Sequence, residues 1–250
     1  MRDKIIYSLQ DLVIGEIVKR LNRFVVEIRV GGEIIKAHNT NTGRLLDYLK
    51  PGRKTLLTKI SGERLRYRLV AVEDLYDSYC IVDTYTQNKI FERLVEENII
   101  SYLRGFRVRR RNPRVENTVF DYELTRESEL MIIETKSAVF RGVGNEAMYP
   151  DAPTVRGRRH IAKLVELKRR NIDTGLIFIA AMKNVSCFKP YRDIDPVIDD
   201  YIYKAIRENV LVRIISIYMD AYGLVYIENP DVPICRSWLR EKESQDLSIS

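Results

Sequence analysis

Short runs in which apolar and polar residues alternate fill the first third of the chain. Between about Leu12 and Asp83 these runs are RFVVEIRV, EIIKAHN, KTLLTKI and RLRYRLVAVE. A period of two is typical of strands that bury one face. Turn signals separate the runs at Gly31-Gly32, Pro51-Gly52 and Ser61-Gly62. The pattern predicts a small OB-like β-barrel, which we place at residues 1–84.

The period changes to that of a helix after residue 84, where apolar residues recur at steps of three and four. Strands are then predicted near 106–111, 118–124 and 130–136, before a basic helix over 155–170. The apolar strand GLIFIAAM, a helix over 196–208 and the strands LVRIISI and YGLVYIE follow. A strand, a crossover helix and a second buried strand form a βαβ unit, so residues 85–237 should be an α/β domain with a mixed sheet. Residues 238–250 are polar and are expected to form a flexible tail.

One predicted hairpin, VFDYELTRESELMIIETKS at residues 119–137, carries the candidate chemistry. If its turn centres between Glu127 and Ser128, Asp121 lies directly opposite Glu134, and Lys136 follows on the same face. The site face is then expected to carry Val119, Asp121, Glu123, Ile132, Glu134 and Lys136, and the core face Phe120, Tyr122, Leu124, Met131 and Ile133.

Two opposed carboxylates repel each other, so a sheet that keeps them together usually needs a counter-charge. Mg²⁺, or Mn²⁺, would supply it, with Asp121 and Glu134 as metal ligands and Lys136 holding water or a phosphate. These three residues are typical of a metal-assisted phosphodiesterase site. The alternative is that Glu134 and Lys136 form an ordinary surface ion pair.

The charge of the chain indicates a polyanionic partner, because 42 Lys and Arg residues outnumber 35 Asp and Glu residues. Two basic clusters flank the hairpin, one before it and one on the following helix, where His160 is expected among the outward-facing side chains. The residues predicted to bind nucleic acid are Arg109, Arg110, Arg111, Arg156, Arg158, Arg159 and Lys163. In the alternative reading, both clusters are simply solvated surface charge. In the loop before the helix, Asp151 and Thr154 are candidate caps of its first turn.

Several classes of function and location are disfavoured. Cys80, Cys187 and Cys235 are widely spaced, so neither a disulfide framework nor a zinc site is expected, and a reducing cytoplasm is the simplest location. No apolar run is long enough to span a membrane, and the start of the chain does not look like a signal peptide. Neither a Walker A motif nor GxGxxG occurs, so no small-molecule cofactor is expected. With only two histidines, a histidine-based triad is also disfavoured.

The chain resembles the sugar fermentation stimulation protein A family over nearly its whole length. The resemblance rests on Asn41-Thr42-Gly43, Pro51-Gly52, LVEENI, FDYEL, IETKS and above all YPDAPTVRGRRHI. It implies an OB-like domain, a PD-(D/E)XK nuclease-like domain and DNA binding. It also implies catalytic roles for Asp121, Glu134 and Lys136. Glu97 matches the extra acidic residue of the first helix, although the spacing there leaves Glu92 and Glu96 as alternatives.

Three functions follow as hypotheses. The first is a DNA-binding protein with a Mg²⁺-dependent nuclease site. The second is a DNA-associated regulator that keeps the nuclease fold without turnover. The third is a module that uses the barrel to bind another protein. The sequence leaves the oligomeric state open, with a homodimer as one option.

Overall fold

The computed structural model describes residues 4–62 and 64–249. The chain forms two compact units, and neither is a continuous segment. Unit 1 contains the residues up to Arg93 together with 180–184 and 216–229, and unit 2 contains 94–179, 185–215 and the residues from Pro230 onward. The division therefore differs from the expected boundary at residue 84. Residues 1–3 and 63 of the predicted first domain, and residue 250 of the predicted tail, lie outside the described residues.

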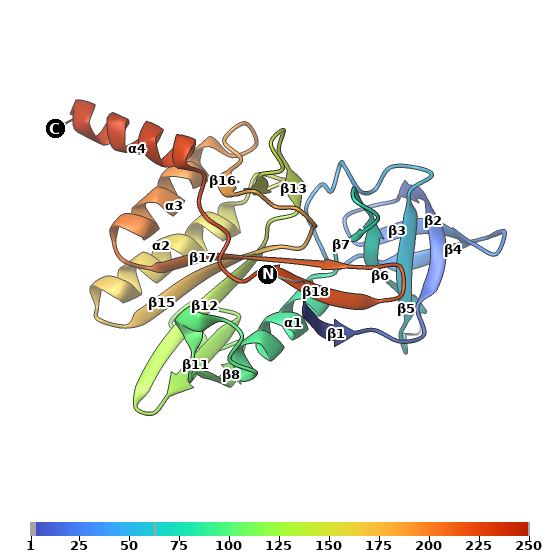
Figure 1. Cartoon of the computed structure of the whole chain (residues 1–250), viewed down its shortest axis with the longest axis horizontal. Coiled ribbons are helices and arrows are strands. Elements are labelled where there is room, and N and C mark those ends of the chain that lie inside the picture. Colours follow the sequence, from blue (N-terminus) through green and yellow to red (C-terminus); the bar gives the residue numbers. More distant parts are fainter. Residues whose placement is uncertain (1–3, 63, 250) are drawn as a thin grey trace. The chain divides into compact units, whose positions relative to one another are not determined.

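The barrel of unit 1 is closed and has the predicted OB-like architecture (Figure 1). Its five strands pair around the ring in the order β2-β3-β4-β6-β5 and back to β2, and the β4–β6 pair is parallel. Ile17, Val26, Ile28, Leu56 and Leu69 are buried from alternating positions and fill the interior. The strands are β2 (Val13–Arg20), β3 (Val25–Val30), β4 (Glu33–His38), β5 (Lys54–Lys59) and β6 (Tyr67–Glu73).

Gly31 and Gly32 form the two-residue turn between β3 and β4, as predicted. Their φ angles are +56° and +91°, a left-handed conformation that glycine adopts at little cost and that matches the twist of a hairpin. Unit 1 also contains β1 (Lys4–Ser8), β7 (Tyr79–Ile81), β18 (Leu224–Asn229) and the second half of β17 (Leu211–Met219). Helix α1 (Thr84–Glu96) begins in unit 1 and ends in unit 2.

Unit 2 is the predicted α/β domain with a mixed sheet. Its strand order is β17-β15-β12-β11-β8, so β12 is central and β8 is an edge strand. Strands β12 (Glu129–Ser137) and β15 (Asp173–Ala180) are parallel and are joined through α2 (Val155–Arg169). Helix α3 (Pro196–Arg207) packs against α2 (Figure 1). The other elements are η1 (Ser101–Leu103), β8 (Arg107–Arg111), β9 (Arg114–Val115), β10 (Thr118–Val119), β11 (Tyr122–Arg126), β13 (Phe140–Arg141), β14 (Ala147–Tyr149) and β16 (Phe188–Pro190).

The strand expected over 118–124 is interrupted. Thr118–Val119 pairs with β9 in a separate ribbon, and the main sheet resumes only at Tyr122. Phe120, in the gap, is buried as expected, but it does not face away from the site. Its ring lies 5.7 Å from the ring of His160, which contacts Glu134, because the interruption breaks the alternation of faces.

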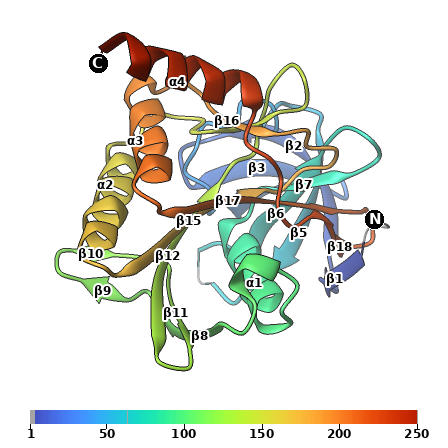
Figure 2. The same cartoon turned by 60° about the vertical axis from the view of Figure 1, so that its left-hand side comes forward.

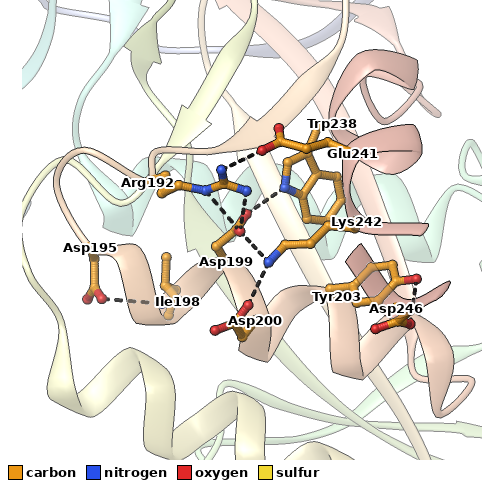
Figure 3. A network of polar contacts seen from close by, with 10 residues as sticks. All are labelled: Arg192, Asp195, Ile198, Asp199, Asp200, Tyr203, Trp238, Glu241, Lys242 and Asp246. Atoms are coloured by element: carbon orange, nitrogen blue, oxygen red, sulfur yellow. Dashed lines mark hydrogen bonds and ion pairs between the residues drawn. The ribbon is translucent and has the colours of Figure 1, made fainter. Parts of the chain in front are cut away.

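The prediction of a flexible tail was wrong, because this segment forms helix α4 (Arg236–Ile249). Trp238 is buried, and its indole nitrogen donates a hydrogen bond to Asp199 at 2.5 Å (Figure 3). The ammonium group of Lys242 lies 2.6 Å from Asp199 and 2.5 Å from Asp200, both on α3. Arg192 adds an ion pair to Asp199 at 2.8 Å. Polar residues of α4 thus hold this helix in place through ion pairs and a hydrogen bond with residues that are far away in sequence.

The expectation of no disulfide was also wrong, since Cys187 and Cys235 are bonded. The segments that carry them are neighbours, because the backbone nitrogen of Cys235 donates to the carbonyl of Phe188 at 2.8 Å. Sequence spacing could not reveal this proximity. Cys80 is a buried free thiol. None of the helices within the described ranges is long and apolar enough to cross a membrane.

Candidate active site

The two carboxylates of the site come from adjacent strands of unit 2. Tyr122 pairs with Ile133 and Arg126 pairs with Glu129. This is the register that the sequence predicts, and continued by one residue it sets Asp121 opposite Glu134. Asp121 itself precedes β11, whereas Glu134 and Lys136 lie on the central strand β12.

Asp121 is held against β12 by Thr135. The backbone N–H and the hydroxyl of Thr135 both donate to Oδ2 of Asp121, at 2.8 and 2.6 Å. Burial, and next the nearby charge of Glu134, raise the pKa of Asp121 despite these hydrogen bonds. A site with both carboxylates ionised is therefore electrostatically unfavourable without further positive charge.

Glu134 is buried, with 3% of its side chain exposed. Its Oε1 accepts hydrogen bonds from Lys136 Nζ and, at 2.5 Å, from His160 Nδ1. Burial acts to raise the pKa of Glu134, but Lys136 and His160 outweigh it and lower that pKa. Burial likewise acts to lower the pKa of Lys136, but the charge of Glu134 raises it. Oε2 of Glu134 is buried and has no hydrogen-bond partner.

His160 is a site residue that the sequence prediction placed wrongly among the outward-facing side chains of α2. It is 7% exposed. Its Nε2 accepts from Arg156 Nε at 3.4 Å, so the Nδ1 that meets Glu134 carries the proton in the neutral tautomer. Its helical spacing from buried Gly157 and Leu164 places it on the packed face, and this spacing was the available signal.

The loop before α2 contributes a helix cap and a buried tyrosine. The hydroxyl of Thr154 accepts from the backbone N–H of Gly157 at 2.9 Å, which confirms Thr154 as the cap of the helix. Tyr149 is buried, and burial is the main cause that raises its pKa. The charge of Lys136 acts on Tyr149 in the opposite direction, which places the phenol near the lysine.

Glu97 does not complete a metal-binding group. It is exposed and follows Glu96, the last residue of α1. Within residues 4–62 and 64–249, no three His, Cys, Asp or Glu side chains come together as a potential metal site. A cation at the Asp121–Glu134 pair would accordingly keep several water or phosphate ligands.

The predicted nucleic-acid-binding residues divide into two groups. Three of them are ion-paired: Arg109 with Glu123 at 3.2 Å, Arg158 with Asp195 at 3.7 Å, and Lys163 with Glu116 at 2.5 Å and Glu166 at 2.8 Å. Arg110, Arg111, Arg156 and Arg159 are exposed, and Arg156 donates a hydrogen bond to His160.

The donor set of the site fits a hard divalent cation. Oε2 of Glu134 is a buried carboxylate oxygen without a partner, and hard cations such as Mg²⁺ take oxygen ligands. The charges of ionised Asp121, ionised Glu134 and protonated Lys136 sum to −1. A cation would therefore offset the repulsion that raises the pKa of Asp121.

Comparison with known proteins extends over both units. The model of the sugar fermentation stimulation protein RE domain matches residues 85–223, and the model of the family's N-terminal OB domain matches 18–82. A sugar fermentation stimulation protein homolog of Pyrococcus furiosus is 40% identical over 206 residues, which cover 82% of this chain and 89% of the relative. A homolog of Archaeoglobus fulgidus is 34% identical over 230 residues, 92% of this chain and 98% of the relative.

A solved structure of the Pyrococcus furiosus protein, in complex with Ca²⁺, has a TM-score of 0.89 at 36% identity and covers 93% of this chain and 99% of that chain. Its agreement with the fold extends to the OB-like barrel and to the restriction-endonuclease-like α/β domain. The chain therefore belongs to the sugar fermentation stimulation protein family.

Proposed function

We propose that this protein binds DNA and hydrolyses phosphodiester bonds at the Asp121–Glu134–Lys136 site with Mg²⁺ or Mn²⁺. The observation that carries the proposal is the buried Oε2 of Glu134, which has no hydrogen-bond partner and lies beside a second carboxylate. The solved relative from Pyrococcus furiosus was obtained with Ca²⁺, another hard cation that prefers oxygen ligands.

The residues of the chain would divide the work. Asp121 and Glu134 would hold the cation, which when bound makes water more acidic and stabilises charge on phosphate oxygens. Thr135 fixes Oδ2 of Asp121, and His160 fixes Oε1 of Glu134. Lys136, half-buried and kept protonated by Glu134, would orient a phosphate oxygen or the attacking water.

DNA is the proposed substrate because the chain has a net charge of +7 and exposed arginines flank the site. Such residues neutralise backbone phosphates without reading the bases. We place the activity in the cytoplasm, and no small-molecule cofactor enters the proposal.

A DNA-associated regulator without turnover is the second candidate. The observation that favours it is that no third acidic side chain joins Asp121 and Glu134 among the residues described. Oε1 of Glu134 is moreover already engaged by Lys136 and His160.

The test compares the natural protein with Glu134→Gln and Asp121→Asn on supercoiled and single-stranded DNA, in Mg²⁺ or Mn²⁺ and in EDTA. Glu129→Gln is the matched control, because Glu129 lies on the same strand but is exposed and paired with Arg126. We expect metal-dependent cutting that both site variants lose and the control keeps. Binding without cutting in every metal would instead establish the regulator.

A further inference from the structure

The cations of the second half of α2 are neutralised by carboxylates. Lys168 pairs with Asp173 at 2.6 Å, Arg169 pairs with Glu208, and Arg170 pairs with Glu116 at 2.6 Å. A phosphate that approached these residues would have to break an ion pair and would meet the released carboxylate. This end of the basic helix is therefore a poor phosphate site, although the sequence makes it look like a good one.

Three arginines on or near strand β8 are different. Arg107, Arg110 and Arg114 are exposed, and none has a carboxylate within 4.0 Å among the residues that the structure describes. The same holds for Arg159 in the first turns of α2. An arginine of this kind gives up only water and counterions when it binds a phosphate, and the released counterions favour binding.

A β-bulge in β8 places Arg110 on the same face of the sheet as Glu134. Glu123 pairs with Arg110 and Leu124 pairs with Val108, so Arg109 is an extra residue in β8. Glu123 also pairs with Ile132, which shares a face of β12 with Glu134. The ion pair from Arg109 to Glu123, at 3.2 Å, confirms that the bulged segment faces this side.

The separation suits a bound backbone. Arg110 lies two strands and about two residues from Glu134, roughly 12 Å between Cα atoms from ordinary sheet spacings. The β9–β10 ribbon continues the surface. Glu116, in the turn of the ribbon, contacts Lys163 of α2 and Arg170 just after it, and Arg114 lies on β9. Figure 2 shows this ribbon beside α2 and the β8 edge below it.

We propose that the phosphate backbone of duplex DNA lies along β8 and β9, held by Arg107, Arg110 and Arg114, and reaches the site past the first turns of α2. The ion-paired end of α2, at Lys168, Arg169 and Arg170, does not contact it. The inference rests on the proposed DNA binding and names the surface that carries it.

The experiment compares two triple variants that remove the same charge. One is Arg107→Gln/Arg110→Gln/Arg114→Gln, and the matched control is Lys168→Gln/Arg169→Gln/Arg170→Gln. Binding to a fluorescent 30-base-pair duplex is measured by anisotropy over a series of KCl concentrations, with Ca²⁺ in place of Mg²⁺. Thermal unfolding establishes that each variant is folded.

The slope of log K against log salt is negative, and it should become shallower by about 0.9 for each lost phosphate contact. For the first triple variant the change should be roughly 2.7, and for the control the slope should stay near the natural value. Equal weakening by both triples, or a larger effect of the control, would overturn the inference while leaving DNA binding in place. A natural protein that binds no duplex at low salt would remove the proposed function, and this inference with it.

Discussion

The contact between His160 and Glu134 gives the sharpest prediction. His160 Nδ1 donates to Oε1 of Glu134 at 2.5 Å from a buried position on α2, and so fixes the carboxylate whose other oxygen is without a partner. A hydrogen bond to a charged group contributes about 1.5–3 kcal/mol. Loss of such an outer partner typically costs a metal site about 10- to 100-fold in affinity. His160→Gln should therefore weaken cation binding about 10- to 100-fold. The amide nitrogen of glutamine corresponds in position to Nε2, so it does not replace the donor Nδ1 that contacts Glu134.

His160→Asn should restore much of the loss, because its amide nitrogen is the same number of bonds from Cβ as Nδ1. Calorimetric titration with Ca²⁺ measures the affinity directly, and steady-state cleavage shows whether kcat or KM changes. His38→Asn, at the other histidine of the chain, is the control. If both His160 variants bind Ca²⁺ like the natural protein, or if both lose only stability and to the same extent, His160 does not position Glu134.

Three further predictions concern the surrounding structure. Because the disulfide closes a 48-residue separation, Cys187→Ser should lower the free energy of unfolding by up to about 4 kcal/mol, measured in urea without reductant. Gly157→Ala should lower the melting temperature despite a better helix propensity, because its Cβ would lie 2.5 Å from the Tyr149 hydroxyl; an unchanged or raised melting temperature would show that the loop yields. The hydrogen bond from Lys189 lowers the pKa of Glu146 below its ordinary value. Ionised Glu146 therefore stabilises the fold above the ordinary pKa, and this stabilisation is lost as the pH falls through the lowered pKa. Glu146→Gln should therefore flatten the decline of the melting temperature in acid, and an unchanged decline would show that other carboxylates cause it.

The parts of the structure that the sequence predicted are those set by local pattern. Alternation along the strands and Gly31-Gly32 at the turn determine the barrel hairpin, since each acts over a few residues. The same is true of the hairpin that brings Asp121 opposite Glu134, because turn position and the period of two together fix the register. The carboxylate pair was therefore predictable before any tertiary contact was known.

What could not be predicted depends on contacts between distant segments. Helix α4 looked like a loose tail, because its docking depends on Asp199, which lies 43 positions before Lys242. His160 looked like one more cation on a basic helix, although it is buried and contacts Glu134, 26 positions earlier. In each case the residue type was visible in the sequence but its partner was not.

The basic residues also have partners that the sequence does not reveal, and here the difference affects function. In the sequence, Arg170 and Arg110 are two arginines with the same charge. In the structure, Arg170 forms an ion pair with Glu116, whereas Arg110 has no carboxylate within 4.0 Å among the described residues. Binding of a polyanion depends on the charges that remain free after folding, because a neutralised cation releases few counterions. A surface rich in lysine and arginine residues is therefore not always one whose charges are available. In unit 2, Lys168, Arg169 and Arg170 are ion-paired, whereas Arg107, Arg110 and Arg114 have no carboxylate within 4.0 Å among the described residues.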